Sequence, residues 1–424
     1  MQKRNMYNRI VLPLLFASAV LLFSCGERAQ NGEVTRVDAP IVTQETTQST
    51  TEADSTNGTG LPETETDKPD TTSIEAEPDE DDNISSLVDQ IYKSLTLEEK
   101  IGQLILVRKP SDKATALEYI GSYHPGGYVL FASDFENETP ETISAFIDSL
   151  NETSSLPLFC AVDEEGGTVV RISKFPQFRA EKFLSPRELI EGGADAVTAD
   201  TDEKCRLLMS LGINFNLAPV ADISEDSSEF IYYRSAGGLE NAVEYVRAYV
   251  LKSSELSIGS TLKHFPGYGG NADTHTGAAY DDRGLDELMA RDLVPFIEGI
   301  EAGADAVMVS HNIVECLDHD NPASLSPAVH ELLRDELGFD GIIMTDDLAM
   351  GAVTDRYDSS EAALMSILAG NDLVCCSDLP AAYQGLYEAA LDGRLTEERI
   401  AESVKRIIKC KLKLGIIDIN TEER

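Results

Sequence analysis

Eight short apolar runs, rich in β-branched residues, alternate along the chain with amphipathic helical stretches. The runs are 103–107, 128–131, 158–163, 214–220, 261–265, 306–311, 341–345 and 372–376. The stretches between them, such as 240–256, 285–302 and 359–369, carry charges on one face and Ala, Leu and Val on the other. Near-continuous apolar strands separated by helices indicate parallel strands that are buried on both faces. Eight such units predict a single (β/α)8 barrel of the TIM type.

The fold prediction has one alternative, and it includes two flanking helices. A doubly wound open sheet is the competing fold, because it uses the same alternation of strands and helices. We expect a leading helix over 85–100 at the base of the barrel, and a last helix over 397–414 that closes the ring.

The N-terminus predicts a lipoprotein signal peptide over residues 1–24. Three basic residues precede an apolar run over 10–23 that is too short for a typical membrane-spanning helix. The following Leu22-Phe23-Ser24-Cys25 looks like a lipobox, in which Cys25 is lipidated and becomes the first residue of the mature protein. The alternative is ordinary signal cleavage, which would leave Cys25 as a free thiol.

Residues 25–83 predict a disordered tether between this anchor and the barrel at 84–424. From 26 to 83 there are 16 acidic residues against 3 basic ones, and few apolar residues. Such a segment cannot bury enough apolar surface to offset the conformational entropy lost on folding. We therefore expect an extracytoplasmic protein whose only membrane attachment is the lipid on Cys25.

Composition excludes several classes of partner and cofactor. The formal net charge of −41 argues against nucleic acid and against an anionic lipid surface. The six cysteines after Cys25 contain no Cys-x-x-Cys spacing, so we expect neither a zinc site nor a disulfide framework. We expect a monomer that needs no metal and no cofactor.

Polar residues stand where several of the eight runs end, and in a (β/α)8 barrel these strand ends carry the reactive groups. Arg234 follows the fourth run in a long loop, and a glycine-rich segment follows the fifth. The residues at or after these strand ends include Asp163, Lys263, His264, Asp273, His275, His311 and Asp346. For Lys263 a structural ion pair and a place in the site are both open, and His311 is either a core histidine or a rim contact.

Four motifs occur in order along the folded part: Val-Asp-Glu-Glu-Gly-Gly-Thr-Val-Val-Arg at 162–171, Lys-His-Phe-Pro-Gly at 263–267, Asp-Thr-His at 273–275, and Thr-Asp-Asp-Leu-Ala-Met at 345–350. This order resembles family 3 glycoside hydrolases, and most of all their NagZ-type β-N-acetylglucosaminidases. The resemblance implies a retaining, exo-acting hydrolase that needs no cofactor. Its implied substrate is terminal β-linked N-acetylglucosamine on peptidoglycan fragments or related amino-sugar glycans.

The resemblance also implies a role for each matching residue. Asp346 matches the nucleophile, with the adjacent Asp347 as the alternative, and His275 matches an imidazole acid/base whose dyad partner is Asp273. The matches to sugar-holding residues are Asp163, Arg171, Arg234, Lys263 and His264. A retaining glycosidase normally uses two carboxyl groups. A histidine can replace one of them, because its ordinary pKa is near 6.5 and a neighbouring carboxylate favours the charged, proton-donating form.

Departures from the family pattern keep other functions open. Resembling proteins usually have His at Tyr268, Gln at Glu164 and Arg at Thr168, so loop gating and fine specificity could differ here. The alternatives are a β-glucosidase or β-xylosidase, a glycoside phosphorylase, or a non-catalytic sugar-binding lipoprotein. The histidine-bearing loop argues against the first pair, whose acid/base is generally a carboxylate from a later domain. Retention of Asp346, Asp273 and His275 argues against the non-catalytic reading.

Overall fold

Eight parallel strands form one closed sheet in the computed structural model, which describes residues 80–271 and 273–418. The strands are β1 (Ile105–Arg108), β2 (Gly127–Leu130), β3 (Phe159–Val162), β4 (Phe215–Asn216), β5 (Gly259–Phe265), β7 (Ala306–Val309), β9 (Ile342–Thr345) and β10 (Val374–Cys376). Their order is β10-β1-β2-β3-β4-β5-β7-β9, and a parallel bridge between Met344 and Leu373 joins β9 to β10. All eight predicted strands are confirmed, and the open-sheet alternative is wrong because the ring closes.

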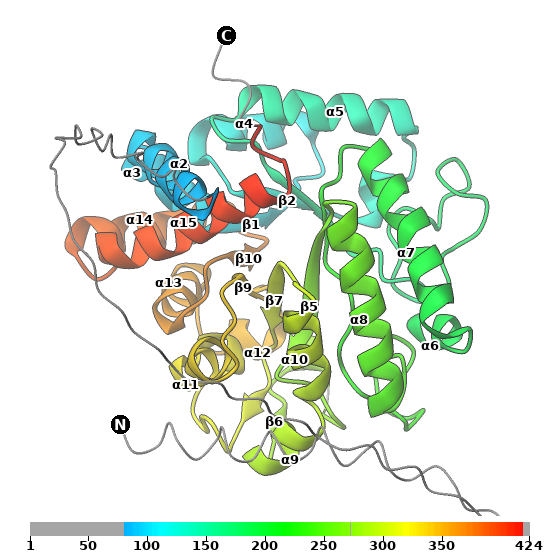
Figure 1. Cartoon of the computed structure of the whole chain (residues 1–424). Coiled ribbons are helices and arrows are strands. Elements are labelled where there is room, and N and C mark those ends of the chain that lie inside the picture. The colour runs from blue at the N-terminus through cyan, green and yellow to red at the C-terminus, as the bar shows by residue number, and fades with distance from the viewer. Residues whose placement is uncertain (1–79, 272, 419–424) are drawn as a thin grey trace, which may run out of the picture. The chain divides into compact units, whose positions relative to one another are not determined.

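Helices surround the strands (Figure 1). They are α2 (Glu80–Ser94), α3 (Leu97–Gln103), α4 (Lys113–Tyr123), α5 (Pro140–Thr153), α6 (Pro186–Ile190), α7 (Gly193–Ser210), α8 (Leu239–Glu255), α9 (Leu285–Ala290), α10 (Val294–Glu301), α11 (Pro327–Glu331), α12 (Gly351–Thr354), α13 (Ser359–Ala369), α14 (Leu379–Asp392) and α15 (Glu397–Lys413). A small parallel pair, β6 (Tyr280–Asp281) and β8 (Ile313–Val314), lies outside the barrel sheet. The predicted signal peptide, Cys25 and nearly all of the predicted tether lie outside the described residues.

Two predicted helices are each divided in the structure. The stretch 285–302 forms α9 and α10, because Pro295 has no N–H to donate to the carbonyl of Arg291 in a continuous helix and instead occupies the first turn of α10. The stretch 85–100 forms α2 and α3, because Thr96 starts a new helix. Its hydroxyl accepts the Glu99 N–H, and the Glu99 carboxylate accepts the Thr96 N–H.

The last helix differs in position from the prediction. The helix that follows the eighth strand is α14, which packs between α13 and the α3–α4 region. The final helix, α15, packs on α2 and α3, and Figure 1 shows these helices together on one side of the barrel. The ring is therefore completed by α14, and α15 covers its base.

A buried lysine on α15 is the least expected feature of this base. Lys411 is fully buried, its Nζ donates to Gln103 Oε1 at 2.7 Å, and it lies 5.0 Å from the centre of the Phe159 ring. Within residues 80–271 and 273–418 no carboxylate forms an ion pair with it. Burial lowers the pKa of Lys411 to about 7.

Lys411→Met should therefore stabilise the protein at neutral and acidic pH. The folded-state pKa lies below the unfolded value, so the unfolded state holds more protons between the two and the stability cost is largest below pH 7. Each pKa unit corresponds to about 1.4 kcal/mol, and loss of the Gln103 hydrogen bond offsets part of the gain. Thermal unfolding should show a higher Tm at pH 6.5 and a smaller difference at pH 9.5.

The matched control is Lys409→Met, which changes an exposed lysine on the same helix. It should leave the pH dependence of the Tm unchanged. A Lys411→Met protein whose Tm difference from wild type is the same at both pH values would contradict the assignment of a depressed pKa.

Candidate active site

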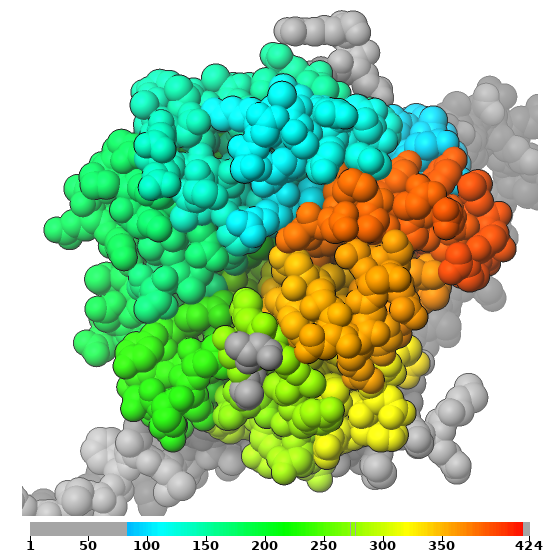
Figure 2. Space-filling model, turned by 180° about the vertical axis from the view of Figure 1, so that it is seen from behind, coloured from blue at the N-terminus to red at the C-terminus, as the bar shows by residue number. Residues whose placement is uncertain are grey.

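A cavity of about 470 Å³ opens at the C-terminal ends of the strands. Every strand of the barrel, or the residue directly after it, contributes to the lining: Arg108, Val129, Phe131, Asp163, Leu217, Lys263, Met308, Asp346 and Cys375. Figure 2 shows a face on which segments coloured cyan, green and orange meet around a hollow. A larger cavity of about 640 Å³ lies between α2, α10 and α15 at the other end of the barrel, and it contains none of the predicted site residues.

Lys263 lies at the centre of an ion-pair network on one wall of this cavity. Its Nζ is 2.7 Å from Asp163 Oδ1 and 2.6 Å from Glu165 Oε1, and the side chain is 1% exposed. Burial lowers the pKa of Lys263, but Asp163 and Glu165 raise it by more, so the amine stays charged. Both sequence alternatives for Lys263 hold, because it makes a structural ion pair and also lines the cavity.

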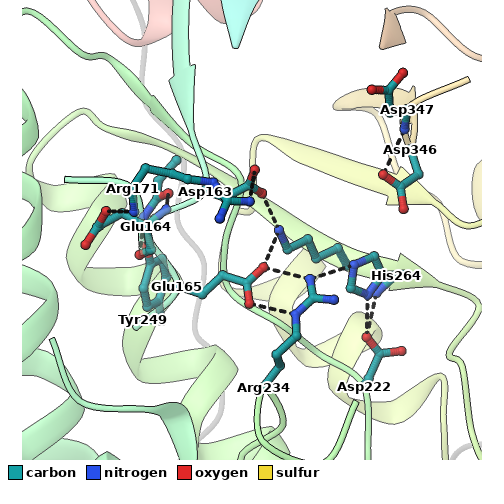
Figure 3. A network of polar contacts seen from close by, with 12 residues as sticks. Asp163, Glu164, Glu165, Arg171, Asp222, Arg234, Tyr249, His264, Asp346 and Asp347 are labelled. Carbon is teal, nitrogen blue, oxygen red and sulfur yellow. Dashed lines mark hydrogen bonds and ion pairs between the residues drawn. The ribbon is translucent and has the colours of Figure 1, made fainter. Parts of the chain in front are cut away.

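Arg234 extends the network to His264. Its Nε and Nη2 donate to the two oxygens of Glu165 at 2.9 and 2.8 Å, and its Nη2 lies 3.1 Å from His264 Nε2. His264 Nδ1–H donates to Asp222 at 2.7 Å, which leaves Nε2 as the acceptor for Arg234. Figure 3 shows Arg234 between Glu165 and His264, with Asp222 beyond the imidazole. Through Glu165, these contacts hold two cationic groups that line the cavity, the guanidinium of Arg234 and the ammonium of Lys263.

Arg171 completes this wall of the cavity. Its Nη2 is 3.3 Å from Asp163 Oδ2, so Asp163 is held by Arg171 on one oxygen and by Lys263 on the other. The guanidinium of Arg171 also lies 5.4 Å from the centre of the Phe131 ring. The structure thus brings all five predicted sugar-holding residues to the same cavity.

The turn after β3 determines which acidic side chain faces the cavity. Glu164 points away from it, because its carboxylate accepts the N–H groups of Arg171 and Ile172 at 2.8 Å. Gly166 has a φ of +107°, and a Cβ there would lie 2.0 Å from the Leu184 carbonyl oxygen. Neither Glu164 nor the exposed Thr168 lines the cavity, so these two departures from the family pattern lie outside the cavity lining.

Asp346 and Asp347 follow β9 and point in opposite directions (Figure 3). The Asp347 N–H donates to Asp346 Oδ1 at 2.8 Å, and the Asp347 carboxylate accepts from Ser377 Oγ and the Ala349 N–H. His311 is buried and donates Nε2–H to the Asp347 carbonyl at 3.0 Å, while its Nδ1 lies 2.7 Å from Ser324 Oγ. Of the two alternatives for His311, the satisfied buried histidine is therefore correct.

The two carboxyl groups have opposite pKa shifts. Burial raises the pKa of Asp346, but the electrostatic effects of His264, His311 and Lys263, together with the hydrogen bond from the Asp347 N–H, lower it by more. The net pKa of Asp346 is below its ordinary value, which keeps the carboxylate ionised. Burial raises the pKa of Asp347 above its ordinary value. A nucleophilic carboxylate must be ionised, and this difference favours Asp346.

The Asp273–His275 pair lies on a short turn, η2 (Thr274–Thr276), after β5. Asp273 Oδ1 accepts both the His275 N–H at 3.0 Å and Nδ1–H at 2.7 Å. Because Nδ1 is bonded to Asp273, Nε2 is the ring nitrogen at which His275 would donate or accept a proton. Burial raises the pKa of Asp273, but its bonds to His275 lower it by more. His275 is 63% exposed and lines the same cavity as Asp346.

Two residues in this network have no assigned role in the sequence analysis. Glu165 is buried and pairs with both Arg234 and Lys263, and these charges outweigh burial and lower its pKa. Asp222 is buried and binds His264 and Tyr268. Glu165 lies inside the motif at 162–171, so the sequence could have identified it as a site residue. For Asp222 the sequence offers only its position after the fourth strand.

Comparison with known proteins establishes the family of this chain. The sequence model of the glycosyl hydrolase family 3 N-terminal domain matches residues 96–410. The chain belongs to glycoside hydrolase family 3. It is 33% identical over 332 residues to the beta-hexosaminidase LpqI of Mycobacterium tuberculosis, across 75% of this chain and 83% of that protein. The resemblance drawn from the four motifs is confirmed.

Solved structures give the same assignment. A family 3 beta-N-acetylglucosaminidase from Paenibacillus sp. FPU-7 has a TM-score of 0.71 at 30% identity, over 76% of this chain and 63% of that one. The beta-glucoside phosphorylase BglX, solved with 2FGlc, has a TM-score of 0.69 at 25% identity, over 78% of this chain and 61% of that one. This family 3 protein is therefore a glycoside hydrolase with the barrel of its relatives.

Proposed function

We propose that this family 3 hydrolase is a retaining, exo-acting β-N-acetylhexosaminidase that removes terminal β-linked N-acetylglucosamine. The observation that carries the proposal is the Asp273–His275 dyad at the same cavity as Asp346. It offers an acid/base from the barrel itself, at the same cavity as an ionised carboxylate. The names of the relatives, beta-hexosaminidase and beta-N-acetylglucosaminidase, support the choice of sugar.

The reaction runs in two steps. In the first, the Asp346 carboxylate attacks the anomeric carbon while His275 Nε2–H protonates the glycosidic oxygen, so the aglycone leaves as an alcohol. In the second, His275 takes a proton from water, and the resulting oxygen nucleophile displaces Asp346 and releases the sugar with its configuration retained. Lys263, Arg234 and Arg171 supply donors to the sugar hydroxyls, while Asp163 supplies an acceptor. Peptidoglycan fragments are the proposed natural source of the sugar.

The proposal is tested by the release of nitrophenol from aryl β-GlcNAc, β-Glc and β-Xyl, each with and without phosphate. We expect the β-GlcNAc substrate to have the highest kcat/KM, and phosphate to have no effect on rate or product. Higher kcat/KM on β-Glc or β-Xyl would favour the glucosidase or xylosidase alternative. A phosphate-dependent rate with a sugar phosphate as product would show a phosphorylase, and no turnover of any substrate would favour a binding protein.

We also propose that the enzyme is held outside the cytoplasmic membrane by a lipid on Cys25. The support is the sequence pattern of residues 1–25, with the acidic composition of 26–83 providing reach. Within the part of the chain that the structure describes, no helix is long and apolar enough to cross a membrane.

Cys25→Ser should release the protein from the membrane fraction without changing kcat/KM. The reason is that lipidation requires the thiol, whereas the cavity is built from residues of the barrel. Fractionation followed by an assay with aryl β-GlcNAc checks both parts. Cys316→Ser, which changes an exposed cysteine of the barrel, is the control and should stay with the membrane. Retention of the Cys25→Ser protein at the membrane would contradict the lipobox.

A further inference from the structure

Tyr268 and Thr274 form a contact that connects the wall with the proposed sugar-binding residues to the segment carrying the dyad. The Tyr268 hydroxyl lies 2.6 Å from Thr274 Oγ1, and both side chains are buried. Thr274 stands directly between Asp273 and His275 in the chain. Tyr268 is also the position at which this chain departs from the histidine that resembling proteins usually have.

Tyr268 is itself held firmly on the side of the sugar-binding residues. Its N–H donates to Asp222 Oδ1 at 2.8 Å, while Asp222 Oδ2 accepts the N–H and the Nδ1–H of His264 at 3.0 and 2.7 Å. The Tyr268 ring packs edge-on against His264, with centroids 5.1 Å apart, and against Phe230 at 4.7 Å. One buried carboxylate therefore fixes both His264 and the backbone of Tyr268.

The side chains of the dyad itself extend toward solvent. His275 is 63% exposed and Asp273 is 37% exposed, whereas Thr274 is fully buried. The bonds between Asp273 and His275 fix the two groups relative to each other but not relative to the cavity. Gly269 and Gly277, with φ values of +55° and +146°, flank the segment and allow its backbone conformations that other residues rarely adopt.

We propose that Tyr268 is a positioning residue whose hydroxyl, through Thr274, holds His275 at the leaving-group side of the cavity. The inference rests on the proposed acid/base role of His275. Through Asp222, the same contact ties the position of the acid to that of His264, which faces the sugar. Burial also raises the pKa of the Tyr268 hydroxyl, which favours its protonated form.

Tyr268→Phe tests the inference, because it removes the hydroxyl and keeps the ring that packs on His264 and Phe230. A misplaced proton donor should slow the first step only where the leaving group needs the proton. We expect kcat/KM, which reports the first step, to fall about 10- to 100-fold on a β-GlcNAc disaccharide and to change little on the dinitrophenyl glycoside. Equal losses on both substrates would show that Tyr268 shapes the sugar site and would overturn the inference.

Thr274 supplies matched variants for the other end of the contact. Thr274→Val keeps the side-chain shape without the hydroxyl and should reproduce the loss seen with Tyr268→Phe. Thr274→Ser keeps the hydroxyl and should recover most of the activity on the disaccharide. The double variant Tyr268→Phe/Thr274→Val should lose no more than either single variant, because one bond is removed in all three. Additive losses, or a serine variant as impaired as the valine variant, would overturn the inference.

The outcomes separate this inference from the proposed function. If wild type does not release nitrophenol from aryl β-GlcNAc, the proposed function fails. If wild type is active and His275→Ala shows the dependence on leaving group, but Tyr268→Phe does not, only the role of Tyr268 fails. Thermal unfolding of each variant identifies any loss that comes from a destabilised barrel, since such a protein would lose activity equally on both substrates.

Discussion

Asp346→Asn should lose turnover by on the order of 10⁴-fold or more in kcat while sugar binding is retained. The amide cannot form the covalent bond to the anomeric carbon, and Asp163, another carboxylate of the cavity, is held by Arg171 and Lys263. Asp347 points away from Asp346 and is bonded to Ser377 and the Ala349 N–H. The ion pairs that hold the proposed sugar-binding residues Lys263, Arg234 and Arg171 do not involve Asp346, so the KM or inhibitor Kd should change much less than kcat.

Covalent trapping identifies the nucleophile directly. Wild type incubated with an activated 2-deoxy-2-fluoro glycoside should accumulate a labelled enzyme, and peptide mapping should place the label on Asp346. Asp347→Asn is the matched control, one residue along the same loop, and it should still be labelled and still turn over substrate. A label on Asp347 or Asp163 would show that the nucleophile is assigned to the wrong carboxylate.

His275→Ala should lose activity in proportion to how much the leaving group needs a proton. General acid catalysis contributes about 10² to 10⁴ in rate, and a β-GlcNAc disaccharide should show close to that full range. A dinitrophenyl glycoside leaves as a stable anion, so its first step should be nearly unaffected and the glycosyl-enzyme should accumulate. Comparing pre-steady-state bursts with steady-state rates on the two substrates measures both effects.

Azide and the dyad partner give two further checks on His275. Azide needs no general base, so it should restore the second step of His275→Ala on the activated substrate and give a glycosyl azide as product. Asp273→Ala should show the same pattern with a smaller loss, because the ring remains while its orientation and charge stabilisation are lost. Equal losses on both substrates, without azide rescue, would show that His275 positions the sugar instead of transferring a proton.

The sequence by itself determined the barrel and the family, and it pointed to the end of the barrel where the candidate site lies. Eight apolar runs separated by helical stretches have few ways to bury both faces of each strand, and the closed ring is the one observed. Asp346 and the Asp273–His275 pair were also accessible from sequence, because each depends on local order. Asp346 directly follows β9, and Asp273 and His275 are close enough in the chain to bond each other.

Helix boundaries were harder to predict from the sequence. The signals that start a new helix are local, and a continuous amphipathic pattern hides them. The amphipathic pattern continues across Thr96 and Pro295, whereas a capping box at the first and a missing N–H at the second start new helices there. The base of the barrel shows the same limit. The helical pattern of 397–414 was clear, but only packing decided that α15 covers α2 and α3.

Only the tertiary structure decided which charged groups meet in the site. Arg234 is 69 residues from Glu165, and Lys263 is 100 residues from Asp163, so their pairing requires the closed ring. Asp163, Glu164 and Glu165 are consecutive acids. The Glu164 carboxylate accepts hydrogen bonds from the backbone N–H groups of 171–173 after the turn at Gly166, and so it does not join the ion pairs of the other two. The Tyr268–Thr274 contact likewise depends on how the loop folds back on Asp222. A strand end specifies where a side chain emerges, but long-range closure specifies what it faces.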